Sequence, residues 1–492
     1  MSGETRKLGQ SAARGAVVTV SGQVVRLGLQ VVGVVLLSRM LEPEDFGLMA
    51  MIAVLITVGQ SIRDFGLSNA AIQAQQVSEQ QRSNLFWLNT GLGVFVAATV
   101  SAAAPFIAEF YSTSDLVPVI CAMSSVFVIF GLMTQSRAHL ARDLRFGPLM
   151  ITDVAPAVVG LAVAVLFAAH GAGVWALVVQ QVVIAVVGLV LSVAFDRWLP
   201  GLPRRSTGMG YFLRYGGFLT LAQIVASLSR NADYVILGYR FGPVATGYYN
   251  RAFELVINPL NQINAPSSKV AVPILSKLQD TRERFDNFLL SGQKTMLFAL
   301  VPVLTLGAVV ADPLVLLVLG DDWVPSSVLL QILMLAAICR VASYATYWVS
   351  LSRGATAVSL WVHLVSAPVL VLSMLIGSIE GVVGVAWGFA AGTAFEWIVS
   401  LVWFSKAAQA PGWRMLTNAM SVFMASAAPA CAAWIVLILL NDVPHISQIL
   451  GSAATFVVVW VVEALFVPLF RRDWVTVIGV VRLIGARSKE AN

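Results

Sequence analysis

The sequence predicts an all-α polytopic membrane protein, because of its composition, the length of its apolar stretches and the charge of its loops. Of its 492 residues, 58% are hydrophobic and only 11% are charged, and the mean hydropathy is +0.83. Soluble domains carry about 25% charged residues. So apolar a chain is typical of a protein with many membrane-spanning helices.

About fourteen stretches contain the roughly 20 mostly apolar residues that a helix needs to cross a bilayer. They cover residues 15–38, 47–68, 84–108, 116–136, 148–169, 173–195, 211–238, 243–265, 288–310, 327–350, 357–378, 382–404, 416–440 and 448–470. The connections are short, and the longest polar one is 266–287. We therefore expect no soluble domain.

The loops alternate in charge along the chain. Every second loop is basic, as at Arg137, Arg142 and Arg145, whereas the loops between them hold mainly acids, such as Glu42 and Asp45. Basic loops stay in the cytoplasm. The rule places the N-terminal residues 1–14 and the basic tail 471–492 in the cytoplasm, and we expect a multi-pass membrane protein.

Short matches recur at an offset of 200 residues and indicate an internal repeat. The matched residues are Gln23 with Gln223, Leu37 with Leu237, Pro43 with Pro243 and Gly47 with Gly247. The pattern predicts a six-helix lobe over 15–200 and a second over 201–410. Six is an even number of spans, so the lobes are related by a parallel repeat about the membrane normal. Two extra helices fill 411–470.

Four charges occupy predicted membrane spans on either side of the Gly242-Pro243 turn. They are Arg230, Asp233, Arg251 and Glu254. A rise of 1.5 Å per residue places all four roughly 13–19 Å below the outer end of their helices. Each unpaired charge at a helix centre costs about 2.5–3.5 kcal/mol on insertion scales. Two interpretations stay open: ion pairs between the two helices, or the lining of a wet cavity that binds a charged substrate.

The first half of the chain carries a related polar set. Gln23, Arg26 and Gln30 fall at helical spacing on one face of the first span. Arg63 and Asp64 lie in the second span. In the seventh span, Gln223 and Arg230 repeat the pattern of the first, and we expect Pro259 to interrupt the eighth span. We therefore expect these residues to line one cavity, with Asp64, Asp233 and Glu254 as its acids.

Arginine is the common element of this set. Guanidinium groups bind phosphate oxygens in a bidentate manner and stay charged in low dielectric. Arg26, Arg63, Arg230 and Arg251 therefore indicate an anionic phosphate or diphosphate as substrate. Arg340 is either a further member or a packing residue. No Walker A sequence occurs, so we expect no ATP-driven step, no cofactor and no metal; a cation gradient or the membrane potential stays open as the energy source.

Several segments resemble the signature of bacterial polysaccharide exporters. They are LSRMLEPEDFGLMAM (37–51), DFGLSNAAIQ (64–73), SNLFWLN (83–89) and LGYRFGPVATGYYNRAFEL (237–255). The family is that of the oligosaccharidyl-lipid flippases within the multidrug/oligosaccharidyl-lipid/polysaccharide exporter superfamily, and the nearest branch is that of the colanic-acid and succinoglycan exporters.

The resemblance implies fourteen helices that work by alternating access. It also implies a cargo of undecaprenyl-diphosphate-linked oligosaccharide, moved from the cytoplasmic to the outer leaflet for surface polysaccharide synthesis, with polysaccharide polymerase and export machinery as partners. Family members hold the diphosphate with cavity arginines, for which Arg26, Arg230 and Arg251 are the candidates here.

Two other functions fit the sequence less well. A cation-coupled multidrug exporter of the same superfamily would have an acidic and aromatic cavity and usually twelve spans. A membrane enzyme acting on lipid-linked sugars would need a sizeable outer loop or a catalytic cluster of His or Asp, and no loop is long enough to build one. The arginine-rich set favours the flippase.

Overall fold

The structure is a computed structural model, and it is helical without strands throughout the residues that it describes. These are residues 3–67, 77–204, 227–468 and the positions 210, 220, 221, 223, 224, 470 and 471, with side chains from Ser21 onward except at Thr356. By internal contacts the chain divides into two units, Met1–Gly247 and Tyr248–Asn492. The predicted boundaries 15–200, 201–410 and 411–470 remain sequence-based predictions, and the tail beyond Arg471 lies outside the described residues.

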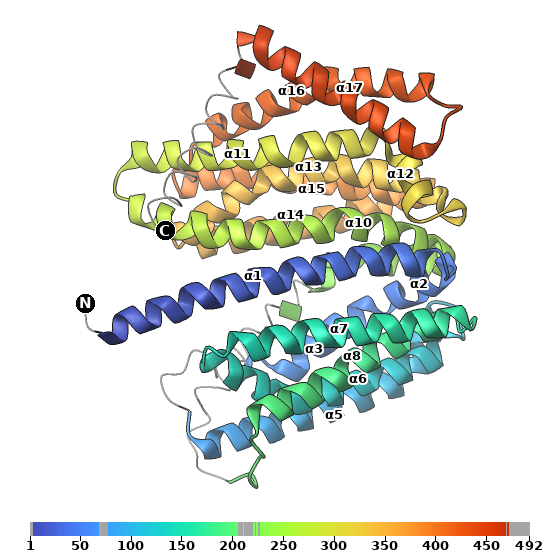
Figure 1. Ribbon diagram of the computed structural model, residues 1–492, viewed down its shortest axis with the longest axis vertical. Helices are drawn as coiled ribbons and strands as arrows, with labels where there is room; N and C mark the ends of the chain where they lie inside the picture. Colours follow the sequence, from blue (N-terminus) through green and yellow to red (C-terminus); the bar gives the residue numbers. More distant parts are fainter. Residues whose placement is uncertain are drawn as a thin grey trace. The chain divides into compact units, whose positions relative to one another are not determined.

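The first unit is built mainly from long helices (Figure 1). They are α1 (Gly3–Ser38), α2 (Pro43–Met51), α3 (Ala53–Asp64), α5 (Glu79–Phe110), α6 (Leu116–Arg142), α7 (Phe146–Ala169), α8 (Val174–Asp196) and the beginning of α10 (Ala232–Leu278). α5 packs on α6, α6 and α7 pack on α8, and α1 packs on α7.

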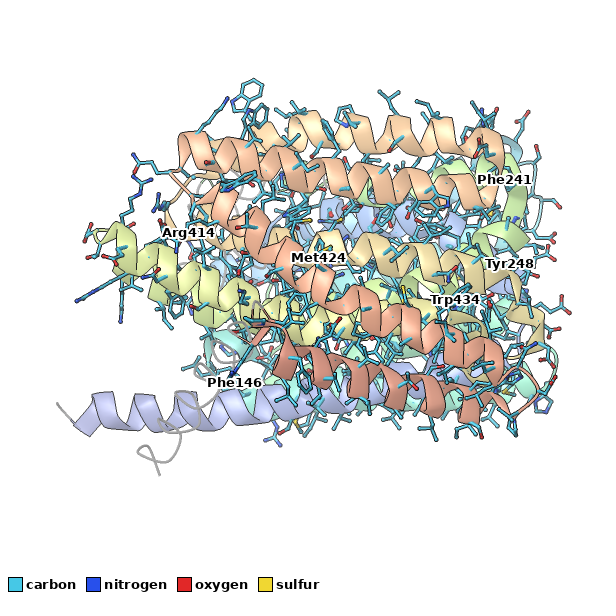
Figure 2. The ribbon with its side chains drawn as sticks, turned by 90° about the horizontal axis from the view of Figure 1, so that it is seen from above. Phe146, Phe241, Tyr248, Arg414, Met424 and Trp434 are labelled. Atoms are coloured by element: carbon cyan, nitrogen blue, oxygen red, sulfur yellow. The ribbon has the colours of Figure 1, made fainter. Side chains whose placement is uncertain are left out.

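The second unit continues from within α10. Its other elements are α11 (Arg282–Val309), α12 (Ala311–Val318), η1 (Asp321–Trp323), α13 (Pro325–Ser352), α14 (Thr356–Gly377), η2 (Ser378–Glu380), α15 (Val382–Ala407), α16 (Gly412–Leu439) and α17 (His445–Phe466). α13 packs on α11 and α15, and α15 also packs on α14. The α16–α17 hairpin packs on α11, and Figure 2 shows Arg414 and Trp434 toward opposite ends of α16.

The all-α membrane fold is confirmed, and the number of spans is close to the prediction. In the described residues, 12 helices are long and apolar enough to cross a membrane. They correspond to the predicted spans except 211–238 and 243–265. Residues 211–219 lie outside the described part, and the 243–265 stretch falls in the more polar helix α10.

Local chemistry explains where helices start and bend. Ser78 and Gln81 form a capping box that starts α5, which satisfies amide groups that otherwise lack partners at a helix start. α10 has one non-helical residue, Gly242, with φ 75° and ψ −173°, a conformation that glycine adopts without steric cost. The predicted break at Gly242-Pro243 is therefore present. Pro259, by contrast, was expected to interrupt its span, but α10 continues through it.

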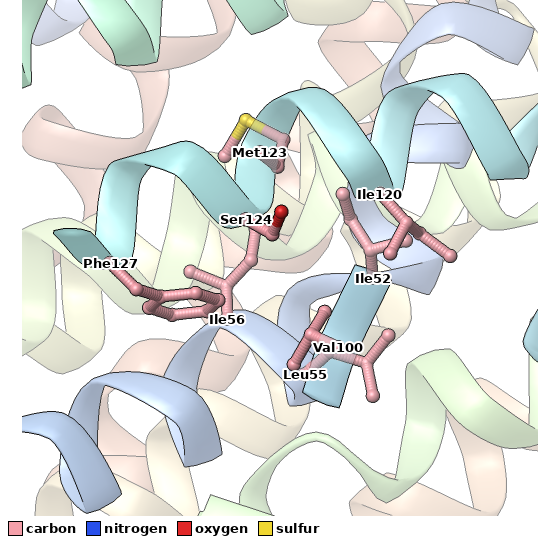
Figure 3. A pocket seen from close by; sticks show the side chains of 8 residues that line it. All are labelled: Ile52, Leu55, Ile56, Val100, Ile120, Met123, Ser124 and Phe127. Atoms are coloured by element: carbon pink, nitrogen blue, oxygen red, sulfur yellow. The ribbon is translucent and has the colours of Figure 1, made fainter. Parts of the chain in front are cut away.

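The core of the first unit is apolar and tightly packed. Leu48, Met51, Ile52 and Ile120 are almost fully buried within it. Figure 3 shows a gap beside this core, lined by Ile52, Leu55, Ile56, Val100, Ile120, Met123, Ser124 and Phe127. Its volume is about 10 Å³, which is close to the minimum for one water molecule. The gap is too small to be a substrate site.

Glycines bring α14 and α15 into backbone contact. Gly377 faces Gly384, and Gly388 faces the carbonyl oxygen of Ser373; a Cβ atom at any of the three would overlap backbone of the other helix. Small residues at i and i+4 let membrane helices approach closely, where packing replaces the hydrophobic effect as the attraction. This contact joins two neighbouring spans of the second unit.

We expect Gly384→Ala and Gly388→Ala to lower the free energy of unfolding by about 1–3 kcal/mol each, since an added methyl group must force the helices apart. Thermal unfolding of the purified protein in detergent measures the effect. Gly91→Ala in α5 is the matched control, because its Cβ would meet no atom within 4 Å. If the α15 variants unfold at the same temperature as Gly91→Ala, the close contact does not stabilise the fold.

Candidate functional site

The polar residues of α1 lie beside its contact with α7. Gly22 and Gly33 of α1 face Met150 and Leu161 of α7. At helical spacing, Arg26 and Gln30 fall close to this contact line. Gln23 and Arg26 are exposed and Gln30 is half-buried. The guanidinium of Arg26 is thus on the accessible surface of the first unit, as a ligand-binding group must be.

Arg63 of α3, unlike Arg26, is bonded to a neighbouring helix. Its Nη1 atom donates to the carbonyl oxygen of Phe130, 3.1 Å away, and to the hydroxyl of Thr134, both on α6. Asn89 of α5, which is fully buried, donates to the carbonyl oxygens of Arg63 and Asp64. These bonds satisfy the end of α3, which would otherwise leave carbonyl groups without partners. Arg63 therefore ties α3 to α6 within the unit.

The segment before the Gly242 break carries Gln223, Arg230 and Asp233. Gln223 is half-buried and Arg230 is exposed. Asp233 is 1% exposed, and its Oδ1 atom accepts a bond of 2.9 Å from the amide of Tyr234. Asn231 approaches Thr57 of α3 at 3.5 Å. The structure thus places this segment against α3. The side chain of Arg230 is exposed, whereas that of Asp233 is buried.

Arg251 and Glu254 form an ion pair within α10. Their side chains are separated by 3.1 Å from Nη1 to Oε2, at 10% and 31% exposure. The sequence led us to consider pairs between helices, whereas this pair joins positions i and i+3 of one helix. It lowers the cost of placing two charges in a span while leaving Glu254 partly accessible.

Several polar groups of α10 form hydrogen bonds with α13 within the second unit. Ser326 donates to the carbonyl oxygen of Tyr248, and Trp348 donates to the hydroxyl of Ser268. Arg340 donates to Asn261 at 3.4 Å. Arg340 is thus at least a packing residue for the polar span.

The repeat residues themselves meet in the first unit. A Cβ on Gly47 of α2 would overlap the carbonyl oxygen of Pro243, and a Cβ on Gly247 would overlap that of Pro43. The contact is reciprocal: the glycine of each Pro-x-x-x-Gly segment receives the proline of the other. The repeated proline and glycine residues are therefore needed for one close contact between backbones. The sequence match alone did not reveal this contact.

Tyr111, at the end of α5, packs beside this contact. Its ring lies against the position of Gly238, and its hydroxyl donates to the carbonyl oxygen of Met51 at 3.4 Å. Burial raises the pKa of Tyr111 to about 12. The phenol therefore stays a hydrogen-bond donor to a higher pH than an exposed tyrosine does.

A charged cluster at the ends of α5, α6 and α8 was missed by sequence reasoning. Arg82 pairs with Asp196, whose other oxygen is 2.7 Å from Nδ1 of His139. The ring of His139 is also 3.5 Å from Asp143, and the guanidinium of Arg82 lies 3.8 Å from the centre of the Trp198 ring. Asp196 was the available signal, as an acid at the end of a span in an otherwise basic loop.

A pocket of about 360 Å³ adjoins this cluster. Both acidic and basic side chains line it, namely Glu79, Asp143, Asp196, Arg82, Arg142, Arg197 and His139. Their charges largely balance one another, so the pocket lacks the excess of positive charge that a diphosphate requires. In the described part of the chain, no group of three potential metal ligands is present.

We expect Arg82→Ala to lower the free energy of unfolding by about 3–5 kcal/mol, because it removes the arginine from a buried ion pair and leaves Asp196 with His139 alone. Asp196 is fully buried and the side chain of Arg82 is 10% exposed. Arg137→Ala is the matched control, since Arg137 and Asp153 are 31% and 40% exposed and such pairs contribute about 0–1 kcal/mol. Chemical denaturation in mixed micelles compares the two. Equal effects would mean that burial does not determine the strength of the Arg82 pair.

Comparison with known proteins identifies the family. A family model described as polysaccharide biosynthesis protein matches residues 36–328. The lipopolysaccharide biosynthesis protein WzxC of Escherichia coli (strain K12) is 27% identical over 372 residues, which are 74% of this chain and 75% of WzxC. The succinoglycan biosynthesis transport protein ExoT of Rhizobium meliloti (strain 1021) is 22% identical over 356 residues, 72% of each chain.

Solved structures agree with the fold. The lipid II flippase MurJ in an inward closed conformation has a TM-score of 0.70 and 13% identity, covering 94% of this chain and all of MurJ. A multidrug resistance MATE family transporter in an inward-facing conformation has a TM-score of 0.55 and 15% identity, covering 80% of this chain and 98% of the transporter. At these identities the likeness shows the fold alone. The family model covers more than half of the chain, and the chain therefore belongs to the polysaccharide biosynthesis protein family of exporters.

Proposed function

We propose that the protein is a flippase that moves an undecaprenyl-diphosphate-linked oligosaccharide from the cytoplasmic to the outer leaflet of the bacterial inner membrane. Family membership supports export of a polysaccharide precursor. The accessible arginines within membrane-spanning helices, Arg26 above all, support a diphosphate as the recognised group. The sugar crosses along the polar faces of the helices while the polyprenyl chain stays in the lipid.

Charge favours this cargo over the cationic substrate of a drug exporter. Arg26 and Arg230 are exposed, and a guanidinium group can hold two phosphate oxygens at once. Arg251 is already bonded to Glu254, so this pair would exchange partners when the diphosphate arrives. Glutamines such as Gln23, Gln30 and Gln223 supply hydrogen-bond donors and acceptors for sugar hydroxyls.

The energy source and the partners belong to the same proposal. A cation gradient or the membrane potential drives the cycle, and the polymerase and export machinery consume the flipped product. Both termini lie in the cytoplasm, so the basic loops face the leaflet in which the cargo is made.

We expect a strain without the gene to lose surface polysaccharide and to accumulate lipid-linked oligosaccharide in the inner leaflet, and the wild-type gene to reverse both. Arg26→Ala and Arg230→Ala should restore at most about a tenth of export, since a lost charge-assisted bond costs roughly 1.5–3 kcal/mol. Two quantities are measured: the amount of secreted polymer and the amount of glycolipid that is labelled in the outer leaflet. Arg284→Ala, at an exposed position at the start of α11, is the control for expression and insertion. Full export by both of these arginine variants would contradict the proposal. New sensitivity to cationic drugs, with unchanged glycolipid, would also contradict it.

A double-mutant cycle separates cargo binding from ion pairing at Arg251. If Arg251 serves only to neutralise Glu254, export lost in Arg251→Ala returns when Glu254→Ala is added. If Arg251 binds the diphosphate, the double variant stays inactive, and this is the result we expect. Glu254→Gln alone should keep export, because it removes the competing carboxylate and preserves the size of the side chain. Export is measured as before, at matched levels of membrane-inserted protein.

A further inference from the structure

The segment that follows α8 is fixed along the beginning of α5. Residues 197–204, here called the strap, are bonded to four α5 side chains. Ser83 accepts from the amide of Gly201 at 3.0 Å, and Trp87 donates to the carbonyl oxygen of Gly201 at 2.9 Å. Asn84 bonds both to the amide and to the carbonyl oxygen of Arg204, and Gln80 donates to that of Leu202.

The side chains of the strap divide into an inner and an outer set. Trp198 faces inward, with its ring on the guanidinium of Arg82 and its edge toward Phe86. Leu199 and Leu202 face outward and are 81% and 80% exposed. The bonds to α5 fix the backbone, so these leucines cannot turn into the protein to bury themselves. With Trp87, which is bonded to Gly201, they put three large exposed apolar side chains at or beside the strap, and clustered exposed apolar groups mark interaction sites.

The register against α5 gives the depth of the strap. Gly201 is bonded to Ser83 and Trp87, where α5 changes from the polar run Glu79–Asn84 to the apolar residues from Leu85 onward. Tryptophan is enriched at this level of membrane helices, between headgroups and hydrocarbon. Trp87 is 42% exposed beside the strap. The outward leucines are therefore at the depth of the bilayer interface.

The polar groups of the strap also fit this location. Backbone groups that enter a membrane must be bonded within the protein, and those of Gly201, Leu202 and Arg204 are bonded to α5. Arg197 and Arg204 flank the leucines and are exposed. Basic side chains beside apolar ones are the combination that binds an anionic membrane surface.

We propose that the strap is a membrane-interface anchor: Leu199 and Leu202 insert among the acyl chains of the leaflet, and Arg197 and Arg204 bind phosphate groups of anionic lipid. Ser83, Asn84 and Trp87 are positioning residues that present the strap to the lipid. The strap is also the start of the connection toward α10, so the anchor holds the first part of that connection at the membrane surface. This proposal is independent of the cargo.

Spin labels test the depth of the strap in the full-length protein. Leu199→Cys and Leu202→Cys are made after Cys121, Cys339 and Cys431 are replaced by serine, and each is labelled in nanodiscs of phosphatidylethanolamine and phosphatidylglycerol. Val458→Cys on α17, 61% exposed in an apolar helix, is the lipid control, and Thr281→Cys, exposed in the polar turn before α11, is the water control. We expect collision with oxygen, relative to a water-soluble nickel chelate, to be severalfold higher at 199 and 202 than at 281.

Two further variants test the parts of the proposal. Asn84→Ala should move the label at Leu202→Cys toward the value of the water control, since it removes two bonds to Arg204. Arg197→Gln with Arg204→Gln, or replacement of phosphatidylglycerol by phosphatidylcholine, should produce a smaller shift in the same direction. A label at 199 or 202 as accessible to nickel as that at 281 would overturn the anchor. Labels shielded from both reagents would also overturn it, since they would show that protein covers the leucines.

Discussion

The absence of hydrogen-bond partners in hydrocarbon is the constraint on which the rest of this structure depends. Every backbone polar group in a spanning segment must find its partner inside the protein, and buried side chains supply some of these partners. Asn89 satisfies the carbonyl groups at the end of α3, and Gln135 in turn donates to Asn89 at 2.8 Å. The resulting network joins α3, α5 and α6, so the residues that solve a solvation problem also hold the first unit together.

The same constraint divides the arginines into two kinds. Arg63 and Arg82 are bonded to neighbouring helices and act as internal ties, whereas Arg26 is exposed on α1. An exposed guanidinium within a spanning helix is costly unless water or a ligand reaches it. The sequence position of an arginine in a span does not by itself distinguish the two kinds.

The features that the sequence predicted are those that depend on the bilayer alone, and the features that it did not predict depend on contacts between helices. Apolar length and loop charge depend on the bilayer alone, so they predicted the helical membrane fold and the segments of the 12 described spans. The Gly242 break followed from the chemistry of glycine and proline. Partners across helices depend on rotation and depth, which a sequence does not specify: the Arg82–Asp196–His139 cluster was missed, and the pairing of Arg251 with Glu254 inside one helix was not foreseen. Pro259 was expected to interrupt a helix that continues, because tertiary packing can satisfy the carbonyl group that a proline frees.

Close backbone contact gives the residues matched at an offset of 200 a structural role. Pro43 and Gly47 meet Pro243 and Gly247 reciprocally, and both glycines lack the room for a Cβ. Contacts made by bare backbone bury little apolar surface, so they depend on shape and separate without exposing large side chains. The residues matched in the sequence therefore form a contact that depends on backbone shape, whereas Arg63 and Arg82 hold the helices of the same unit together through side-chain bonds.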